Sequence, residues 1–179
     1  MGIARLAICF FLLFAFGIAA LVIARPYLLK MPAKSQAERE YHRLVSEAKS
    51  EISVGSPELI ERIVMDIQFA ETITTVHLLG PNGKSMDFAS LRELPNRTTV
   101  TVDYCHEVET IISTLNTLTA LKEVTFYYCG PPEMILESLD NANLIEIAIH
   151  SYQPWPDAYQ FVVKTGDRLP NCTIKLTND

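Results

Sequence analysis

The chain has 179 residues, of which 49% are hydrophobic, and a net charge of −6 at neutral pH. Four of its 15 basic residues precede residue 35, so the remainder carries 11 basic against 21 acidic side chains, a net charge of −10. This balance argues against a nucleic-acid partner and against broad docking on anionic lipid. The segment after residue 35 is long enough to form one domain around a single core.

The N-terminal segment, residues 1–24, is predicted to be a transmembrane anchor. Residues 6–24 contain no charge and are flanked by Arg5 and Arg25, and a stretch of this length spans a bilayer as a helix. A cleaved signal peptide is the alternative, although its apolar region is usually shorter. More basic residues follow the span than precede it, so the positive-inside rule favours a single-pass protein whose soluble domain is cytoplasmic.

Residues 25–71 are predicted to form a juxtamembrane segment and a helical stalk or cap. Residues 35–52 place Tyr41, Leu44 and Ile52 on one helical face. Ser56 followed by Pro57 is typical of a helix start, and a second apolar helix is expected from there. A coiled-coil dimerisation stalk is the alternative interpretation of these helices.

The third segment, residues 72–179, contains five short β-like stretches at a nearly constant period. The first apolar residues of these stretches lie 24, 24, 23 and 27 positions apart. A fixed period in this range predicts a solenoid, in which each repeat buries its apolar face against its neighbours. The stretches comprise residues 75–78, 99–102, 123–126, 146–149 and 173–176.

The segments between these strands have helical spacing of apolar residues. Residues 106–120, for example, place Val108, Ile111 and Leu115 on one face. The others are 85–94, 132–143 and 156–165, the last followed by Gly166 as an expected stop. Such crossovers connect parallel strands.

Alternation within the strands decides between two α/β architectures. Val124 and Phe126 are expected to point inward and Thr125 and Tyr127 outward, so that one face of the sheet is wet. A doubly wound sheet, covered on both faces, would have near-continuous apolar strands instead. The sequence therefore predicts a one-sided β-α solenoid with parallel strands.

One complete repeat runs from Leu121 to Cys129 with the sequence L-K-E-V-T-F-Y-Y-C. It follows the pattern L-x-x-[LV]-x-[LF]-x-x-[NC], and four further copies keep parts of it in register. Residues 72–179 thus resemble a degenerate leucine-rich-repeat protein of the cysteine-containing type. For the equivalent Cys105 and Cys129 the resemblance implies buried thiols beside the turn backbone; a disulfide between neighbouring strands is the alternative on distance alone.

A polar and aromatic row is expected along the exposed strand face. Asp103, Tyr127 and His150 have the same offset in three consecutive repeats, with His77 and Tyr104 as neighbours. A mixed polar and aromatic surface is typical of binding. Acid–base catalysis by His150 is disfavoured because Tyr127 would separate it from Asp103 and no nucleophile is placed beside it.

The expected function is protein–protein recognition by a membrane-anchored module through this face. The partner is an unknown protein, and the N-terminal helix would contact the lipid bilayer. No catalytic residue, cofactor, metal site or small-molecule substrate is inferred. The alternatives are a structural subunit of a membrane complex that pairs through the C-terminal strand edge and a membrane-anchored enzyme.

Overall fold

The computed structural model describes residues 33–80, 88–105, 108–152 and 158–178. Two compact units are distinguished, residues 1–36 and 37–179, and the sheet with the helices that connect its strands belongs to the second. The predicted anchor at residues 1–24 lies outside the described residues. In the described part of the chain, no helix combines the length and apolar character needed to cross a membrane.

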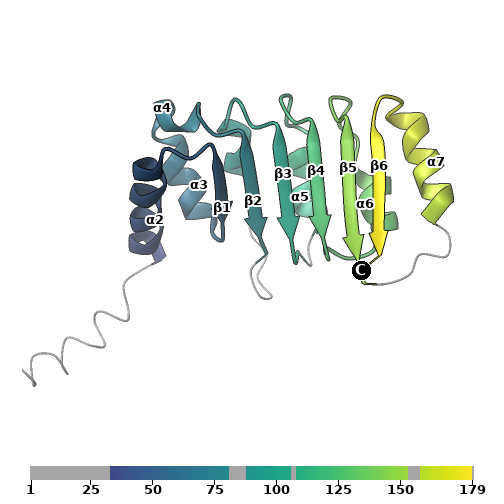
Figure 1. Cartoon of the computed structure of the whole chain (residues 1–179), viewed down its shortest axis with the longest axis horizontal. Helices are drawn as coiled ribbons and strands as arrows, with labels where there is room; N and C mark the ends of the chain where they lie inside the picture. Colours follow the sequence, from purple (N-terminus) through teal and green to yellow (C-terminus); the bar gives the residue numbers. More distant parts are fainter. Residues whose placement is uncertain (1–32, 81–87, 106–107, 153–157, 179) are drawn as a thin grey trace, which may run out of the picture. The chain divides into compact units, whose positions relative to one another are not determined.

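The second unit is built on a six-stranded, all-parallel sheet whose strands follow one another in chain order (Figure 1). Val76, Val100 and Val124 lie side by side on successive strands, as their 24-residue spacing predicts. Consecutive order gives the sheet no point at which the winding reverses, unlike a doubly wound fold. The strands are β1 (Glu51–Val54), β2 (Thr75–Leu79), β3 (Thr99–Asp103), β4 (Glu123–Tyr127), β5 (Glu146–Ser151) and β6 (Thr173–Asn178).

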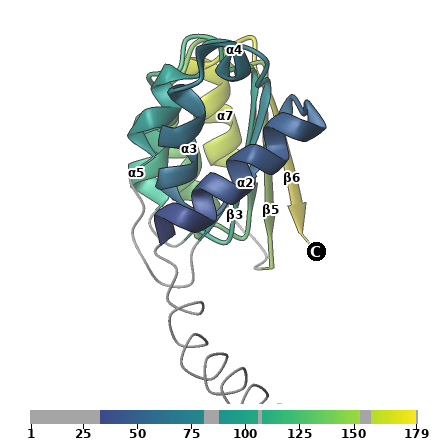
Figure 2. The same ribbon diagram turned by 90° about the vertical axis from the view of Figure 1, so that its left-hand side faces the viewer.

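Helices connect the strands and lie on one face of the sheet, as predicted (Figure 2). The helix expected at residues 85–94 is a short 3₁₀ helix in the part that is described. Gly166 does not end its helix, which continues to Arg168. The elements are α3 (Pro57–Val64), α4 (Ile67–Ala70), η1 (Ala89–Glu93), α5 (Val108–Leu115), α6 (Pro132–Ser138) and α7 (Ala158–Arg168).

Side-chain burial alternates along each inner strand. Val124 and Phe126 of β4 are buried in the core, as predicted. Thr125 and Tyr127, predicted to be exposed, are half-buried. Their neighbours on the flanking strands stand side by side with them and cover part of their surface.

The prediction of one helix over residues 35–52 is wrong at its C-terminal end. Helix α2 (Ala33–Glu47) ends before β1, and Ile52 is an inward-facing residue of that strand. Strand β1 is therefore a sixth repeat, aligned 24 residues before β2. Its signal is weak because Lys49 stands where the next repeat has Ile73, and because Ile52 continues the apolar spacing of the helix before it.

Helix α2 contributes to the core beside the first repeat. Its buried side chains Ala37, Tyr41 and Leu44 join the same cluster as Ile52 and Val54. The Tyr41 hydroxyl donates to Asp66 at 2.5 Å, which lowers the pKa of that carboxyl. The helical segment preceding β1 thus caps the first repeat, which a solenoid needs to cover its end.

Candidate functional site

Two tyrosines hold an unusual backbone conformation at the ends of neighbouring strands. Tyr104 follows β3 and Tyr128 follows β4, and both are left-handed, with φ of 51° and 55°. This conformation costs a residue with a side chain about 1–2 kcal/mol. The turns stay tied to the sheet, because the N–H of Tyr104 donates to Tyr127 and that of Tyr128 donates to His150.

A third tyrosine, Tyr152, lies beside these two but follows an extended strand rather than adopting a left-handed conformation. Strand β5 continues in extended form through Ser151, whose side chain is buried, so Tyr152 comes out on the open face. The rings of Tyr128 and Tyr152 are stacked, with centroids 3.8 Å apart and planes inclined by 5°. Tyr104 and Tyr128 have centroids 5.3 Å apart, and the hydroxyls of Tyr104 and Tyr152 are 3.4 Å apart.

A second aromatic pair lies one position earlier on the strands. Tyr127 stacks on His150 with ring centroids 4.4 Å apart and an interplanar angle of 21°. The register places Asp103 beside Tyr127 on the other side. We call Tyr104, Tyr127, Tyr128, His150 and Tyr152 the tyrosine cluster.

The structure brings together four of the five predicted binding residues. Asp103, Tyr104, Tyr127 and His150 all lie where β3, β4 and β5 end. His77 does not join them. It lies two residues before the end of β2, with its Nε2 2.9 Å from a carboxylate oxygen of Glu51.

The sequence reasoning missed Tyr128 and Tyr152. An offset of 24 residues links Tyr104, Tyr128 and Tyr152 and could have suggested them. The strand register hides this relation, because β5 aligns with β4 at an offset of 23 residues. Tyr152 reaches the open face because β5 continues for one more extended residue, Ser151, than β4 does.

Two buried cysteines, Cys105 and Cys129, follow the left-handed tyrosines and make hydrogen bonds with the backbone of these turns. The N–H of Cys105 donates to the Cys129 sulfur at 3.5 Å, and the Cys129 thiol lies 3.3 Å from the Val102 carbonyl and 3.2 Å from that of Tyr127. Both cysteines are unlinked and buried, as predicted. Burial raises the pKa of the Cys129 thiol to about 12, so it remains protonated and able to donate.

Acidic side chains on the open face differ in their partners. Glu51 pairs with His77, and Glu146 pairs with Lys175 at 2.7 Å. Asp103 makes no ion pair with any described residue. The hydrogen bond to Tyr152, together with the nearby Asp103 charge, raises the pKa of Tyr104, which therefore stays neutral at physiological pH.

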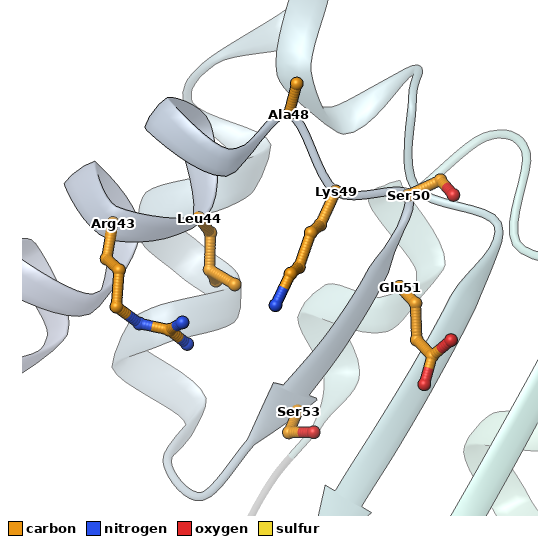
Figure 3. Close-up of a pocket in the computed structure, with 7 residues that line it drawn as sticks. All are labelled: Arg43, Leu44, Ala48, Lys49, Ser50, Glu51 and Ser53. Carbon is orange, nitrogen blue, oxygen red and sulfur yellow. The ribbon is translucent and has the colours of Figure 1, made fainter.

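Two hollows are lined by residues that the structure describes. One, of about 260 Å³, is lined by Tyr128, Gly130, Pro131, Ser151 and Tyr152 and adjoins the tyrosine cluster. The other, of about 450 Å³, lies between the end of α2 and β1 (Figure 3). Its basic side chains are already paired: Arg43 with Glu40 and Glu47, and Lys49 with Glu47.

The side chains of the cluster offer several kinds of contact to a ligand. His150 stacks on Tyr127, which separates it from Asp103 as expected from the sequence. In the described ranges no group of three potential ligands is placed to hold a metal ion. Stacked rings, phenol hydroxyls and a carboxylate without an ion pair among the described residues are groups that can contact a ligand.

Comparison of the chain with protein-family models, with curated proteins and with solved structures gives no match.

Proposed function

We propose that this protein is a leucine-rich-repeat-like recognition module that binds another protein through the tyrosine cluster. The observation that supports this is the pair Tyr104 and Tyr128, bulky residues in a backbone conformation that glycine adopts at much lower cost. Strained residues of this kind cluster at functional sites. The strain here holds aromatic rings at the edge of the open face.

The exposure of the cluster supports binding. Tyr104 is 53% exposed and Tyr152 is 62% exposed. Tyrosine is enriched among the residues that dominate interface energetics, because it offers a large rigid surface at low entropic cost. Stacking fixes these rings before a partner arrives and so reduces the ordering cost of binding.

Membrane attachment completes the proposal. The uncharged residues 6–24 would hold the module at a bilayer, and the excess of basic residues after them would keep it on the cytoplasmic side. The recognition face would then act on proteins at or near that membrane.

Photo-crosslinking and matched tyrosine variants test the proposal. A photoreactive residue at position 152 should trap a partner in cells that express the chain. The purified partner should then bind Tyr152→Ala at least tenfold more weakly than the wild type, the loss expected for an interface hot spot. Tyr159 of α7, 82% exposed, provides the control: Tyr159→Ala should leave the Kd unchanged. Equal losses in both variants, or trapping only from position 159, would place the interface elsewhere.

A second candidate function is that of a structural subunit which pairs through β6. Ile174 and Leu176 are only half-buried, whereas their neighbours Ile147 and Ile149 are buried. Thr173 donates its N–H to Ile145 of the preceding repeat. In a parallel ladder the backbone N–H groups of every second residue point to the same neighbouring strand. Thr173 points its N–H to the β5 side, so Lys175 does too, and the N–H of Leu176 points away from β5.

Sedimentation of the full-length chain in density-matched detergent separates this candidate from the first. If β6 pairs with another copy, Leu176→Pro should convert a dimer to a monomer, because proline removes the outward donor. A wild-type chain that is monomeric at high concentration excludes self-pairing.

A further inference from the structure

We propose that the tyrosine cluster recognises a positively charged side chain, an arginine of the partner, held between Asp103 and the ring of Tyr104. This inference rests on the proposed function and adds the chemistry of the partner. It draws on the distribution of charge over the open face and on the surroundings of the last residue of β3.

The acidic side chains on the open face differ in whether they have a partner of opposite charge. Glu51 on β1 and Glu146 on β5 have cationic or imidazole partners, whereas Asp103 and Glu123 make no ion pair with a described residue. Glu123 accepts a hydrogen bond from the Thr99 hydroxyl and lies at the other end of its strand from the tyrosine cluster. Asp103 also stands directly before Tyr104 in the chain. With a net charge of −10 after residue 34, the surrounding field attracts cations and repels anions.

The surroundings of Asp103 match the parts of an arginine side chain. The register places Leu79 of β2 beside Asp103. The Leu79 side chain is 43% exposed, so the aliphatic stem of the arginine can pack against it. The Asp103 carboxylate can accept two parallel N–H bonds from a guanidinium group. The ring of Tyr104 contacts the ring of Tyr128 and meets Tyr152 through its hydroxyl, and it remains more than half exposed, so a planar cation can stack on it.

Gly80 takes the position after β2 that Tyr104 takes after β3. It follows Leu79 and donates its N–H to the Asp103 carbonyl at 2.6 Å. A Cβ atom at this position would overlap the Tyr104 carbonyl oxygen, so only glycine fits. The three-tyrosine series therefore has no fourth ring on β2.

Arginine fits this place better than the other ligand classes. Lysine supplies the charge but neither the flat surface nor the bidentate pattern. A neutral sugar would leave the Asp103 charge uncompensated, and an acidic peptide would be repelled.

Two small ligands of nearly the same shape test the assignment. Backbone amide spectra of the ¹⁵N-labelled full-length chain in nonionic detergent would be recorded with N-acetyl-arginine amide and with N-acetyl-citrulline amide, which lacks the charge. The arginine compound should shift the amide signals of Leu79, Asp103 and Tyr104 and bind about tenfold more tightly than citrulline, because a charged hydrogen bond is lost in the latter. Equal binding of the two compounds, or shifts confined to other strands, would overturn the assignment.

Variants show whether the local carboxylate is responsible. Asp103→Asn preserves the shape of the side chain and should weaken binding of the arginine compound about tenfold. Glu137→Gln removes the same charge from an exposed position on α6 and should have no such effect. A similar loss in both variants would show that only net charge matters and would overturn the proposed contact.

The same variants separate this inference from the function on which it rests. If Tyr152→Ala abolishes binding of the trapped partner but Asp103→Asn changes neither its Kd nor the salt dependence, recognition by the cluster stands and the arginine contact is wrong. If the arginine compound binds at Asp103 but Tyr152→Ala leaves partner binding intact, the cation site stands and the proposed interface is wrong.

Discussion

The two faces of the sheet have opposite character. The helix-covered face is apolar and closely packed, as Val124 and Phe126 show, and its residues recur at the repeat period. The open face carries threonines, carboxylates and a tyrosine cluster whose backbone is strained at Tyr104 and Tyr128. The comparison indicates that the buried face specifies the fold, while the open face has kept features that cost stability. Such features cluster at functional sites, which is the basis of the proposed binding role.

The largest expected difference between the faces is at adjacent positions of β4. Phe126→Ala should lower the free energy of unfolding by about 3–5 kcal/mol, because it removes a fully buried ring and leaves a cavity. Thr125→Ala on the open face should cost less than about 1 kcal/mol. Urea denaturation measures both values. Equal costs would mean that β4 is covered on both sides.

A second prediction concerns a charged side chain that is buried in the core. Arg97 takes the repeat position that Ile73 and Leu121 fill in the neighbouring repeats, yet it is only 4% exposed and its Nε has no hydrogen-bond partner among the described residues. Burial lowers the pKa of Arg97 to about 10. Arg97→Leu should therefore raise the free energy of unfolding by about 1–4 kcal/mol.

The pH dependence and a control sharpen this test. Because the folded state lowers the pKa of Arg97, the unfolded state binds the proton more tightly and the penalty is complete at neutral pH. It should decrease only as the pH rises above about 10. Arg92→Leu, at an exposed site, should not stabilise the chain. A destabilised Arg97→Leu variant would show that the guanidinium group has a favourable role in the core.

Sequence periodicity predicted the buried face better than the open one. Val100, Val124 and Ile147 lie in the predicted register because burial demands an apolar residue at each repeat. Strand β1 was missed because its four residues follow a helix with compatible apolar spacing. Tyr128 and Tyr152, the partners of Tyr104 in the cluster, were missed for a different reason. Their positions depend on the backbone angles after β4 and on the residue at which β5 ends, and the pattern of apolar residues contains neither.

A third prediction concerns strain away from the proposed site. Ala48, just after α2, is left-handed with φ of 49°. Ala48→Gly should raise the free energy of unfolding by about 0.5–1 kcal/mol, because the relief of strain exceeds the added freedom of the unfolded chain. Binding of the trapped partner should not change. Loss of stability in this variant would mean that the Ala48 methyl group makes a contact worth more than the strain.

The smallest change in stability is expected at Tyr104, where strain and contact oppose each other. Tyr104→Ala keeps the strained backbone and loses ring contacts worth about 0.5–1.5 kcal/mol. Tyr104→Gly loses the same contacts but relieves about 1–2 kcal/mol of strain. The free energy of unfolding of the glycine variant should therefore stay within about 1 kcal/mol of the wild-type value. It should also exceed that of the alanine variant. At Thr101, an ordinary position of β3, glycine should instead be less stable than alanine. Both Tyr104 variants should lose partner binding equally, since binding needs the ring. A glycine variant that is destabilised by several kcal/mol would show that the ring of Tyr104 serves the fold, and the contrast between the two faces would then fail at the residue on which it depends most.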